Sequence, residues 1–142
     1  MIARSMPGHL IRRLQQKSGQ AFARHMQAAG FDVTSVQFAA MDAIVADPGI
    51  DQATVAARIG YDRATIGGVI DRLETKGFVT RKVSATDRRA REVRPTDEGR
   101  NAFAAMAPRV TEVQQDILDP LTPEERERFM ELARKAVGLD PE

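Results

Sequence analysis

Residues 51–77 read DQATVAARIGYDRATIGGVIDRLETKG, and they contain two short helical patterns separated by a tight turn. Asp51 is a favourable N-cap for a short helix that ends at Gly60, and Asp62 is one for a second helix that ends at Gly77. The second helix has an apolar face at helical spacing, formed by Ile66, Val69, Ile70 and Leu73. Two short helices joined by such a tight turn predict a helix-turn-helix.

A β-hairpin pattern follows directly after the second helix. Residues 78–83 are rich in β-branched and aromatic side chains and predict a strand, residues 84–90 predict a polar loop, and residues 91–94 predict a short return strand. Pro95 has no N–H to donate, so we expect it to stop the ladder. A hairpin in this place is the wing of a winged helix-turn-helix.

Positive charge is concentrated in the same region. Residues 72–94 contain eight basic and three acidic residues, although the net charge of the whole chain is only +1. A basic segment on a nearly neutral chain favours a localised phosphate-binding surface. On charge alone, a solvated charged hairpin is an equal alternative.

Helices are predicted on both sides of this core. Apolar residues recur at helical spacing over residues 8–29, and Thr34 begins a capping box before the next helix. Thr96 and Thr122 are N-caps for two further helices, and Pro108 is expected to kink or interrupt the first of these. We therefore expect a mainly α fold with a small β-hairpin, as one domain over residues 1–142. Its winged helix-turn-helix core covers residues 34–95, and the flanking helices cover residues 8–29 and 96–138.

Several classes of function find no support in the sequence. The chain has 142 residues, no cysteine and two histidines, which argues against disulfides, thiolate metal sites and thiol redox sensing. No nucleophile elbow, phosphate-cradling loop or metal-ligand cluster is present, so we expect neither an enzyme nor a cofactor. The N-terminus lacks the apolar stretch of a secretory signal and no segment is long enough to span a membrane, so a cytoplasmic location is expected.

The outward face of the second helix in the quoted stretch carries the candidate DNA contacts. An α-helix fits the major groove of B-DNA, and its N-terminal residues reach base edges. Arg63 suits a guanine edge, and Thr65 suits a base or a thymine methyl group. The Gly67-Gly68 pair allows close approach of the backbone to DNA, or alternatively tight packing on a neighbouring helix. The predicted contacts from this helix are Arg63, Ala64, Thr65, Gly68 and Arg72.

These residues resemble the MarR (multiple-antibiotic-resistance regulator) family of transcription regulators. Residues 62–77, within the stretch YDRATIGGVIDRLETKGFVTR, are similar to its recognition helix. The segment Asp87-Arg88-Arg89, followed by Thr96-Asp97-Glu98-Gly99, is similar to its wing motif. Pro95 departs from that motif, where the family usually has Leu. The resemblance covers essentially the whole chain, because helix number, order and length agree.

The resemblance implies specific roles for the wing and for the end helices. Asp87 would orient the hairpin and a wing arginine would enter the minor groove, with Arg88, Arg89 and Arg91 as candidates. An ordinary surface ion pair between Asp87 and Arg89 is the alternative. Family members are homodimers whose first and last helices intertwine, which implies a palindromic operator on double-stranded DNA. A monomer with its end helices packed on its own core is the alternative.

An effector site is the last implication. MarR-like proteins often bind small anionic or aromatic compounds between the dimerisation helices and the DNA-binding core. His9, Arg12 and Arg13 lie at the start of the first helix, and an arginine there suits a carboxylate. The alternatives are solvated side chains or phosphate contacts. The sequence predicts a sequence-specific regulator, as a repressor released by a small, aromatic carboxylate-type ligand; the competing hypothesis is a winged-helix protein-interaction module without direct DNA reading.

Overall fold

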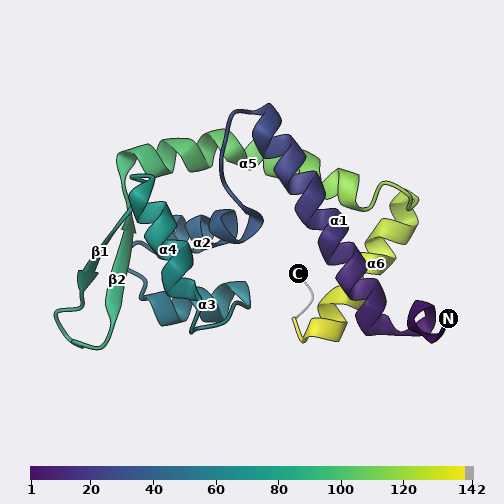
Figure 1. Cartoon of the computed structure of the whole chain (residues 1–142), viewed down its shortest axis with the longest axis horizontal. Helices are drawn as coiled ribbons and strands as arrows, with labels where there is room; N and C mark the ends of the chain where they lie inside the picture. Colours follow the sequence, from purple (N-terminus) through teal and green to yellow (C-terminus); the bar gives the residue numbers. More distant parts are fainter. Residues whose placement is uncertain (140–142) are drawn as a thin grey trace.

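The computed structural model describes residues 1–139 as helices joined to one β-hairpin (Figure 1). In chain order the elements are the 3-10 helix η1 (Ile2–Ser5), α1 (Pro7–Ala28), α2 (Ser35–Ala46), α3 (Gln52–Ile59), α4 (Ile66–Thr75), β1 (Val79–Val83), β2 (Arg91–Pro95), α5 (Asp97–Ile117) and α6 (Pro123–Val137). The predicted mainly α fold with a small hairpin is confirmed. Residues 140–142 of the predicted domain lie outside the described part.

Helix α5 bridges two groups of elements. Figure 1 shows α2, α3, α4 and the hairpin below one half of α5, and α1 and α6 beside the other half. We call the first group the head, and it contains the predicted winged helix-turn-helix. Helix α1 packs across α5. Within residues 1–139, no helix combines the length and the apolar character needed to cross a membrane.

Capping residues set most of the helix starts where the sequence predicted them. The Thr34 hydroxyl accepts the Gln37 N–H at 3.2 Å, and the Gln37 side-chain oxygen accepts the Thr34 N–H at 3.2 Å. Thr122 and Glu125 form the same reciprocal box, with Pro123 at the first helical position. Each box satisfies backbone donors that a helix start would otherwise leave unpaired.

Helix α4 begins later than predicted. The prediction placed Asp62 as its N-cap, but the helix starts at Ile66, and the residues between them form a turn. The Asp62 carboxylate accepts the Ala64 N–H at 2.9 Å, and the Asp62 carbonyl accepts the Thr65 and Ile66 N–H groups at 3.1 Å each. Asp62 therefore shapes the turn that leads into the helix, because a short Asp side chain bonds readily to the backbone two residues on.

Pro95 does not stop the ladder, contrary to the prediction, because β2 includes it opposite Val79. The N–H of Thr96 donates to the Phe78 carbonyl at 2.9 Å. Hydrogen-bonded and non-hydrogen-bonded pairs alternate along an antiparallel ladder, so the Val79–Pro95 pair is a non-hydrogen-bonded one. The Pro95 nitrogen, which carries no hydrogen, thus faces away from β1, and no hydrogen bond of the ladder is lost.

Pro108 does not interrupt α5, which continues through it as one helix. Figure 1 shows the ribbon arching downward in its second half, on the side where α1 crosses it. Proline removes one backbone donor and crowds the preceding turn, which bends a helix without necessarily ending it. The continuous α5 is what connects the head to α1 and α6.

The apolar core lies inside the head and beneath α5. Its aromatic part is a row in which Phe38 stacks on Phe103 at 5.1 Å between ring centroids and meets Phe22 at 6.2 Å. Fully buried side chains from α2, α4 and β2 complete it, among them Met41, Ile44, Ile70, Leu73 and Val93. In contrast, α6 has no buried residue.

Gly99 fixes the start of α5 against the base of the wing. A Cβ at this position would lie 2.0 Å from the backbone oxygen of Phe78, so only glycine fits. The Thr96 side chain caps the helix here by accepting the Gly99 N–H at 3.0 Å. The opposite edge of β2 pairs with the segment before α3, since Val93 and Ile50 are joined by a backbone bond of 2.8 Å. The wing is therefore anchored to α5 and to the entry of α3.

Candidate DNA-binding surface

The turn between α3 and α4, residues 61–65, is the most exposed part of the helix-turn-helix, and we call it the reading turn. Gly60 ends α3 in the left-handed conformation with φ 66°, which redirects the chain sharply. Arg63, Ala64 and Thr65 follow in the turn itself, and all three are exposed. The sequence predicted these residues on a helix, whereas the structure places them immediately before one.

The exposed face of α4 is free of neighbouring protein at Gly68. A Cβ there would meet no atom within 4 Å, and Gly68 is exposed. At Gly67 a Cβ would only touch the end of the Gln52 side chain, at 3.9 Å. Tight packing on a neighbouring helix, the alternative role for the glycine pair, is therefore wrong. Arg72 is also exposed, one helical turn after Gly68.

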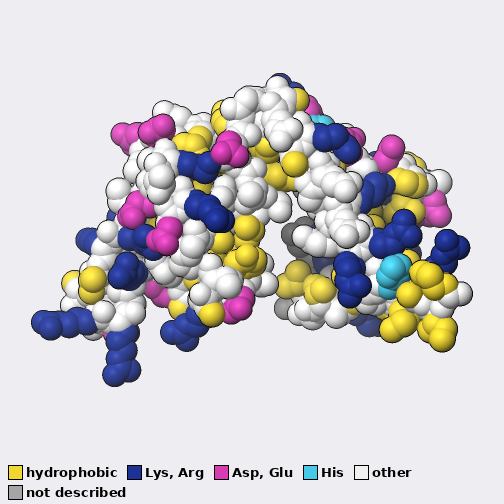
Figure 2. All heavy atoms as spheres, viewed as in Figure 1, with side chains coloured by type: hydrophobic (Ala, Val, Ile, Leu, Met, Phe, Trp, Pro, Cys, Tyr) yellow, Lys and Arg dark blue, Asp and Glu magenta, His cyan; other side chains and the backbone are white. Residues whose placement is uncertain are grey.

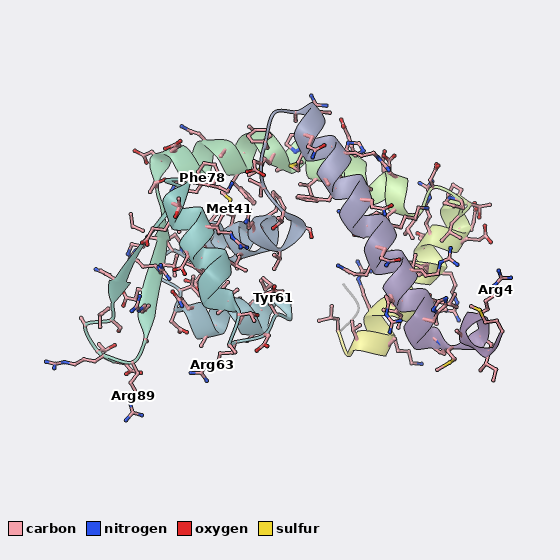
Figure 3. The ribbon with its side chains drawn as sticks, in the orientation of Figure 1. Arg4, Met41, Tyr61, Arg63, Phe78 and Arg89 are labelled. Carbon is pink, nitrogen blue, oxygen red and sulfur yellow. The ribbon has the colours of Figure 1, made fainter. Side chains whose placement is uncertain are left out.

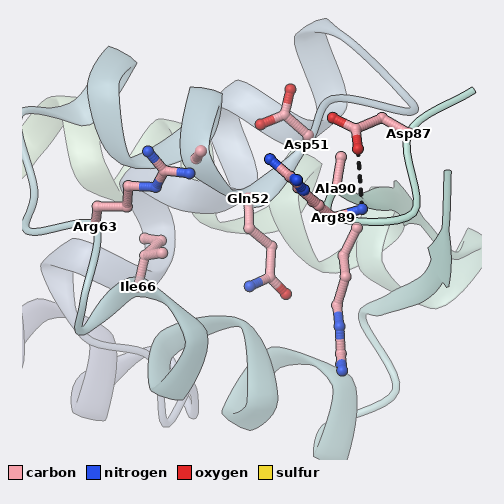
Figure 4. Close-up of a pocket in the computed structure, with 9 residues that line it drawn as sticks. Asp51, Gln52, Arg63, Ile66, Asp87, Arg89 and Ala90 are labelled. Carbon is pink, nitrogen blue, oxygen red and sulfur yellow. Dashed lines mark hydrogen bonds between the residues drawn. The ribbon is translucent and has the colours of Figure 1, made fainter.

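The tip of the wing is held in shape by hydrogen bonds to its own backbone. The Asp87 carboxylate accepts the Arg89 N–H at 3.0 Å (Figure 4). The buried Ser84 hydroxyl accepts the N–H groups of Thr86 and Asp87 at 3.3 Å each. Asp87 thus bonds to the backbone of Arg89, and no ion pair between the two side chains occurs in the described structure.

The reading turn and the wing border one hollow, which we call the shared concavity. Its volume is about 500 Å³, and its lining comes from α3, the reading turn, α4, the wing loop and β2 (Figure 4). The lining residues are Asp51, Gln52, Ala53, Arg63, Ile66, Asp87, Arg89, Ala90 and Arg91. The structure thereby brings together four of the predicted DNA contacts, Arg63, Asp87, Arg89 and Arg91.

The other predicted DNA contacts lie on the same head but outside this lining. Ala64, Thr65, Gly68 and Arg88 are exposed beside it. Arg72 lines a different hollow of about 370 Å³, together with Asp32, Thr34, Gln37, Thr75 and Lys76. The structure therefore separates Arg72 from the arginines of the shared concavity.

The arginines of this surface carry unneutralised charge. Within residues 1–139, Arg63, Arg88, Arg89 and Arg91 make no ion pair and no side-chain hydrogen bond. Arg63 and Arg89 extend from the same lower edge of the head in Figure 3, and Lys and Arg side chains project from that edge in Figure 2. Exposed, unpaired guanidinium groups at one edge form a surface that attracts an anionic polymer.

One carboxylate at the back of the concavity is held in its ionised form. Asp51 caps α3, and its carboxylate accepts the Thr54 N–H at 2.9 Å and the Thr54 hydroxyl at 2.8 Å. The N–H bond, followed by the hydroxyl bond, lowers the pKa of Asp51 below its ordinary value of 3.8, because both stabilise the charged form. Asp51 is thus a structural anion within a cationic surface.

Sequence reasoning missed one side chain that joins β1 to the helix-turn-helix, Arg81. It is nearly buried and bonds to α3 and α4. The signal was present, because strand residues two apart share a face, and Arg81 follows the buried Val79 on the face toward α4. A cation on a buried strand face needs partners, which the sequence does not identify.

The predicted effector residues lie on α1, outside the head. His9 is partly buried, and Arg12 and Arg13 are exposed. None of the three lines the apolar groove of about 860 Å³ that α1, α5 and α6 form, although their neighbours Ile11 and Leu14 do. Their role in ligand binding stays a prediction.

Comparison with known proteins assigns the chain to a family. The family model described as MarR family matches residues 31–90, from the segment before α2 to the wing loop. The transcriptional regulator HosA of Escherichia coli is 34% identical over 138 residues, which cover 97% of this chain and 99% of HosA. The chain belongs to the MarR family. HosA and other matched relatives are transcriptional regulators, so membership places the chain in a family of transcription regulators.

Solved structures of MarR-family regulators share the whole fold. The PcaV regulator of Streptomyces coelicolor, solved in complex with its natural ligand, has a TM-score of 0.82 and 35% identity, covering 95% of this chain and 94% of PcaV. BpsR of Bordetella bronchiseptica, whose DNA binding is regulated by 6-hydroxynicotinic acid, has a TM-score of 0.84 and 28% identity, with 95% of each chain covered. The predicted winged helix-turn-helix is thereby confirmed.

Proposed function

We propose that this MarR-family protein binds double-stranded DNA sequence-specifically through the reading turn, α4 and the wing. One observation carries the proposal: Arg63 of the reading turn and Arg89 of the wing tip line the same concavity, exposed and unpaired. A helix start beside a basic hairpin suits the major groove and the adjacent backbone or minor groove of one duplex. Because the reading turn and the wing lie at one edge, they can contact the major groove and the adjacent backbone or minor groove of one duplex together.

Each residue of the surface has a distinct task in this proposal. Arg63 bonds to a guanine edge, Ala64 and Thr65 contact a base or thymine methyl, and the bare backbone at Gly68 permits close approach. The remaining arginines contribute charge toward phosphates or the minor groove, with Asp87 shaping the loop that presents them; these are Arg72, Arg88, Arg89 and Arg91.

The test separates base reading from backbone binding. A duplex is first selected from a random-sequence pool, and its affinity and that of a scrambled duplex are measured for Arg89→Ala and Thr65→Ala. Arg89→Ala is expected to weaken both duplexes alike and to reduce the salt slope of log K by about 0.9, the value for one phosphate contact. Thr65→Ala is expected to weaken only the selected duplex. Arg24→Ala, an exposed arginine of α1, is the control.

The same experiment addresses the protein-interaction alternative. If the wild-type protein retards no duplex from the pool at low salt, direct DNA reading is wrong and the interaction module is favoured. Equal loss on both duplexes from the Thr65 variant would instead contradict base reading while leaving DNA binding intact.

We also propose that the apolar groove is covered by a second copy of the chain. Helix α6 has no buried residue, and its apolar side chains are exposed: Met130 is 40% exposed, Leu132 48% and Val137 72%. Phe129 of α6 and Ile117 of α5 line the groove as well. A helix with an apolar face that its own chain does not bury indicates a partner surface. A two-fold dimer would place two reading surfaces about 34–36 Å apart on a palindromic operator.

We further propose that the regulator is a repressor released by a small aromatic carboxylate. Two proteins that share this fold support the proposal: PcaV was solved with its natural ligand, and the DNA binding of BpsR is regulated by 6-hydroxynicotinic acid. His9, Arg12 and Arg13 are the groups offered for the carboxylate, since a guanidinium fork bonds both oxygens. A thermal-shift screen of benzoate- and nicotinate-type acids is expected to find a stabilising compound whose effect falls in Arg12→Ala or Arg13→Ala and persists in Arg24→Ala. No shift with any acid would contradict this part of the proposal.

A further inference from the structure

Arg81 connects three elements of the head from a nearly buried position. Its side chain is 12% exposed, and it extends from β1 toward α3 and α4. One guanidinium nitrogen donates to the Gln52 Oε1 atom of α3 at 2.8 Å, and the other donates to the Glu74 carboxylate of α4 at 3.1 Å and to Asp71. These bonds, with the opposing carboxylate charges, outweigh burial and raise the pKa of Arg81, so the group stays charged.

No other side-chain hydrogen bond joins β1 to α4 within residues 1–139. The opposite strand, β2, is fixed by backbone bonds to the segment before α3, where Gly49 donates to the Val93 carbonyl at 2.9 Å. Arg81 thus connects the free side of the hairpin to the helix that follows the reading turn. Gln52, its partner on α3, also lines the shared concavity between Arg63 and Arg89.

The contacts of Arg81 contribute little to the free energy of unfolding for a side chain that is nearly buried. Its Nε atom is buried and has no hydrogen-bond partner, which leaves a desolvated donor unpaired. The carboxylate partners of Arg81 are largely exposed, Asp71 at 62% and Glu74 at 43%, and ion pairs with exposed groups contribute little to the free energy of unfolding. A cation with three defined partners fixes the relative orientation of the elements, which an apolar contact does not do.

We infer that Arg81 is a positioning residue that sets the wing relative to the reading turn, so that Arg89 and Arg63 reach one duplex together. Arg81 itself does not touch DNA, because its guanidinium lies against α3 and α4. This inference rests on the proposed DNA-binding function. Its consequence is an energetic coupling between Arg81, inside the head, and Arg89, at the wing tip.

A double-mutant cycle measures that coupling. The Kd for the selected duplex is determined by fluorescence anisotropy for the wild type, Arg81→Met, Arg89→Ala and the double variant. We expect the loss caused by Arg89→Ala to be about fivefold smaller in the Arg81→Met background, within the range seen for residues of one network. The salt slope of Arg81→Met should also fall by about 1–2, because the wing no longer reaches its phosphates.

Matched variants test whether the coupling is specific to the Arg81 guanidinium. Arg94→Met, in the neighbouring strand, should leave the Arg89→Ala loss unchanged, and Arg81→Lys should show partial coupling because it keeps charge without the planar fork. If circular dichroism shows that Arg81→Met is not folded, a second variant replaces it in the cycle. This variant is Asp71→Asn, which removes the charge of an exposed partner of Arg81.

Three outcomes are decisive. Additive losses in the cycle would overturn the inference. The triple variant Arg81→Met, Asp71→Asn, Glu74→Gln is also decisive. If it bound the selected duplex with wild-type affinity, the inference would be overturned, because neutralising the unpaired carboxylates would then be enough to restore binding without the Arg81 contacts. Failure of the wild type to bind any duplex refutes the proposed function itself.

Discussion

Replacing Gly68 with Ala is expected to change stability and DNA affinity in opposite directions. Gly68 is exposed, it is the third residue of α4, and a Cβ there would meet no atom within 4 Å. Ala is favoured over Gly by roughly 0.5–1 kcal/mol within helices. Because Gly68 lies in the first turn, we expect the lower value, an increase of about 0.5 kcal/mol in the free energy of unfolding.

The affinity is expected to fall because the new methyl group stands on the face that approaches the bases. If it holds the backbone away from one base pair, the loss is comparable to one mismatched position, about 1–3 kcal/mol, or roughly 5- to 150-fold in Kd. The free protein does not experience this penalty, since nothing in it occupies the space. Sequence-independent binding should change little, because the phosphate contacts come from the arginines.

Urea unfolding and fluorescence anisotropy at one fixed salt concentration measure the two effects. Gly19→Ala is the matched control, because a Cβ at Gly19 also meets no atom within 4 Å and the residue lies in α1, away from the head. It should not alter affinity for the selected duplex. A Gly68→Ala protein that binds this duplex like the wild type would refute close backbone approach, and one that unfolds more easily would refute the absence of steric conflict.

The remaining predictions concern the folded core, one helix cap and the subunit interface. Gly99→Ala should lower the free energy of unfolding by about 2–3 kcal/mol, measured in urea, because its Cβ would overlap the Phe78 oxygen; an unchanged midpoint would contradict the close contact. Asp51→Ala should cost about 1 kcal/mol at pH 7. Because the pKa of Asp51 is lowered in the folded state, its stabilisation is present above pH 3.8 and is lost as the pH falls below that value. The difference in free energy of unfolding between wild type and variant should therefore shrink at about pH 3. A constant difference would exclude the carboxylate as its source. Asp51→Asn, which keeps a cap without titrating, should lack that acid-dependent loss. Leu132→Glu should shift sedimentation from dimer to monomer, and Glu127→Lys, at an exposed polar position of the same helix, should not; a dimeric Leu132→Glu protein would contradict the proposed interface.

Features that depend on neighbours in sequence were predictable. The capping boxes at Thr34 and Thr122 and the cap at Thr96 involve side chains and N–H groups three residues apart. The exit of α3 at Gly60 likewise follows from one residue that tolerates a positive φ. These local signals were enough to predict the order of the elements and the helix-turn-helix, and the reading turn and wing supplied the candidate arginines.

Two local predictions failed, one because of strand pairing and one because of a competing local turn. Pro95 was expected to end the strand, but the register turns its nitrogen away from β1. Asp62 was expected to start a helix directly, but its carboxylate and carbonyl form a turn that delays the helix to Ile66. The sequence shows that Pro95 lacks an N–H, but the strand register determines whether the ladder needs that N–H. The sequence likewise shows that Asp62 can accept backbone N–H groups, but not whether they belong to a helix or to a turn.

The order of the elements, most of the helix caps and the residue types of the cationic surface followed from the sequence alone, because each depends on residues within a few positions of one another. Which of those residues share a hollow, and which contacts hold them there, became visible only in three dimensions. Arg81 meets Gln52 and Asp71, 29 and 10 positions away in the chain, and Gly99 meets Phe78. Such contacts depend on how elements pack in three dimensions, and nothing in the spacing of residues along one element specifies them.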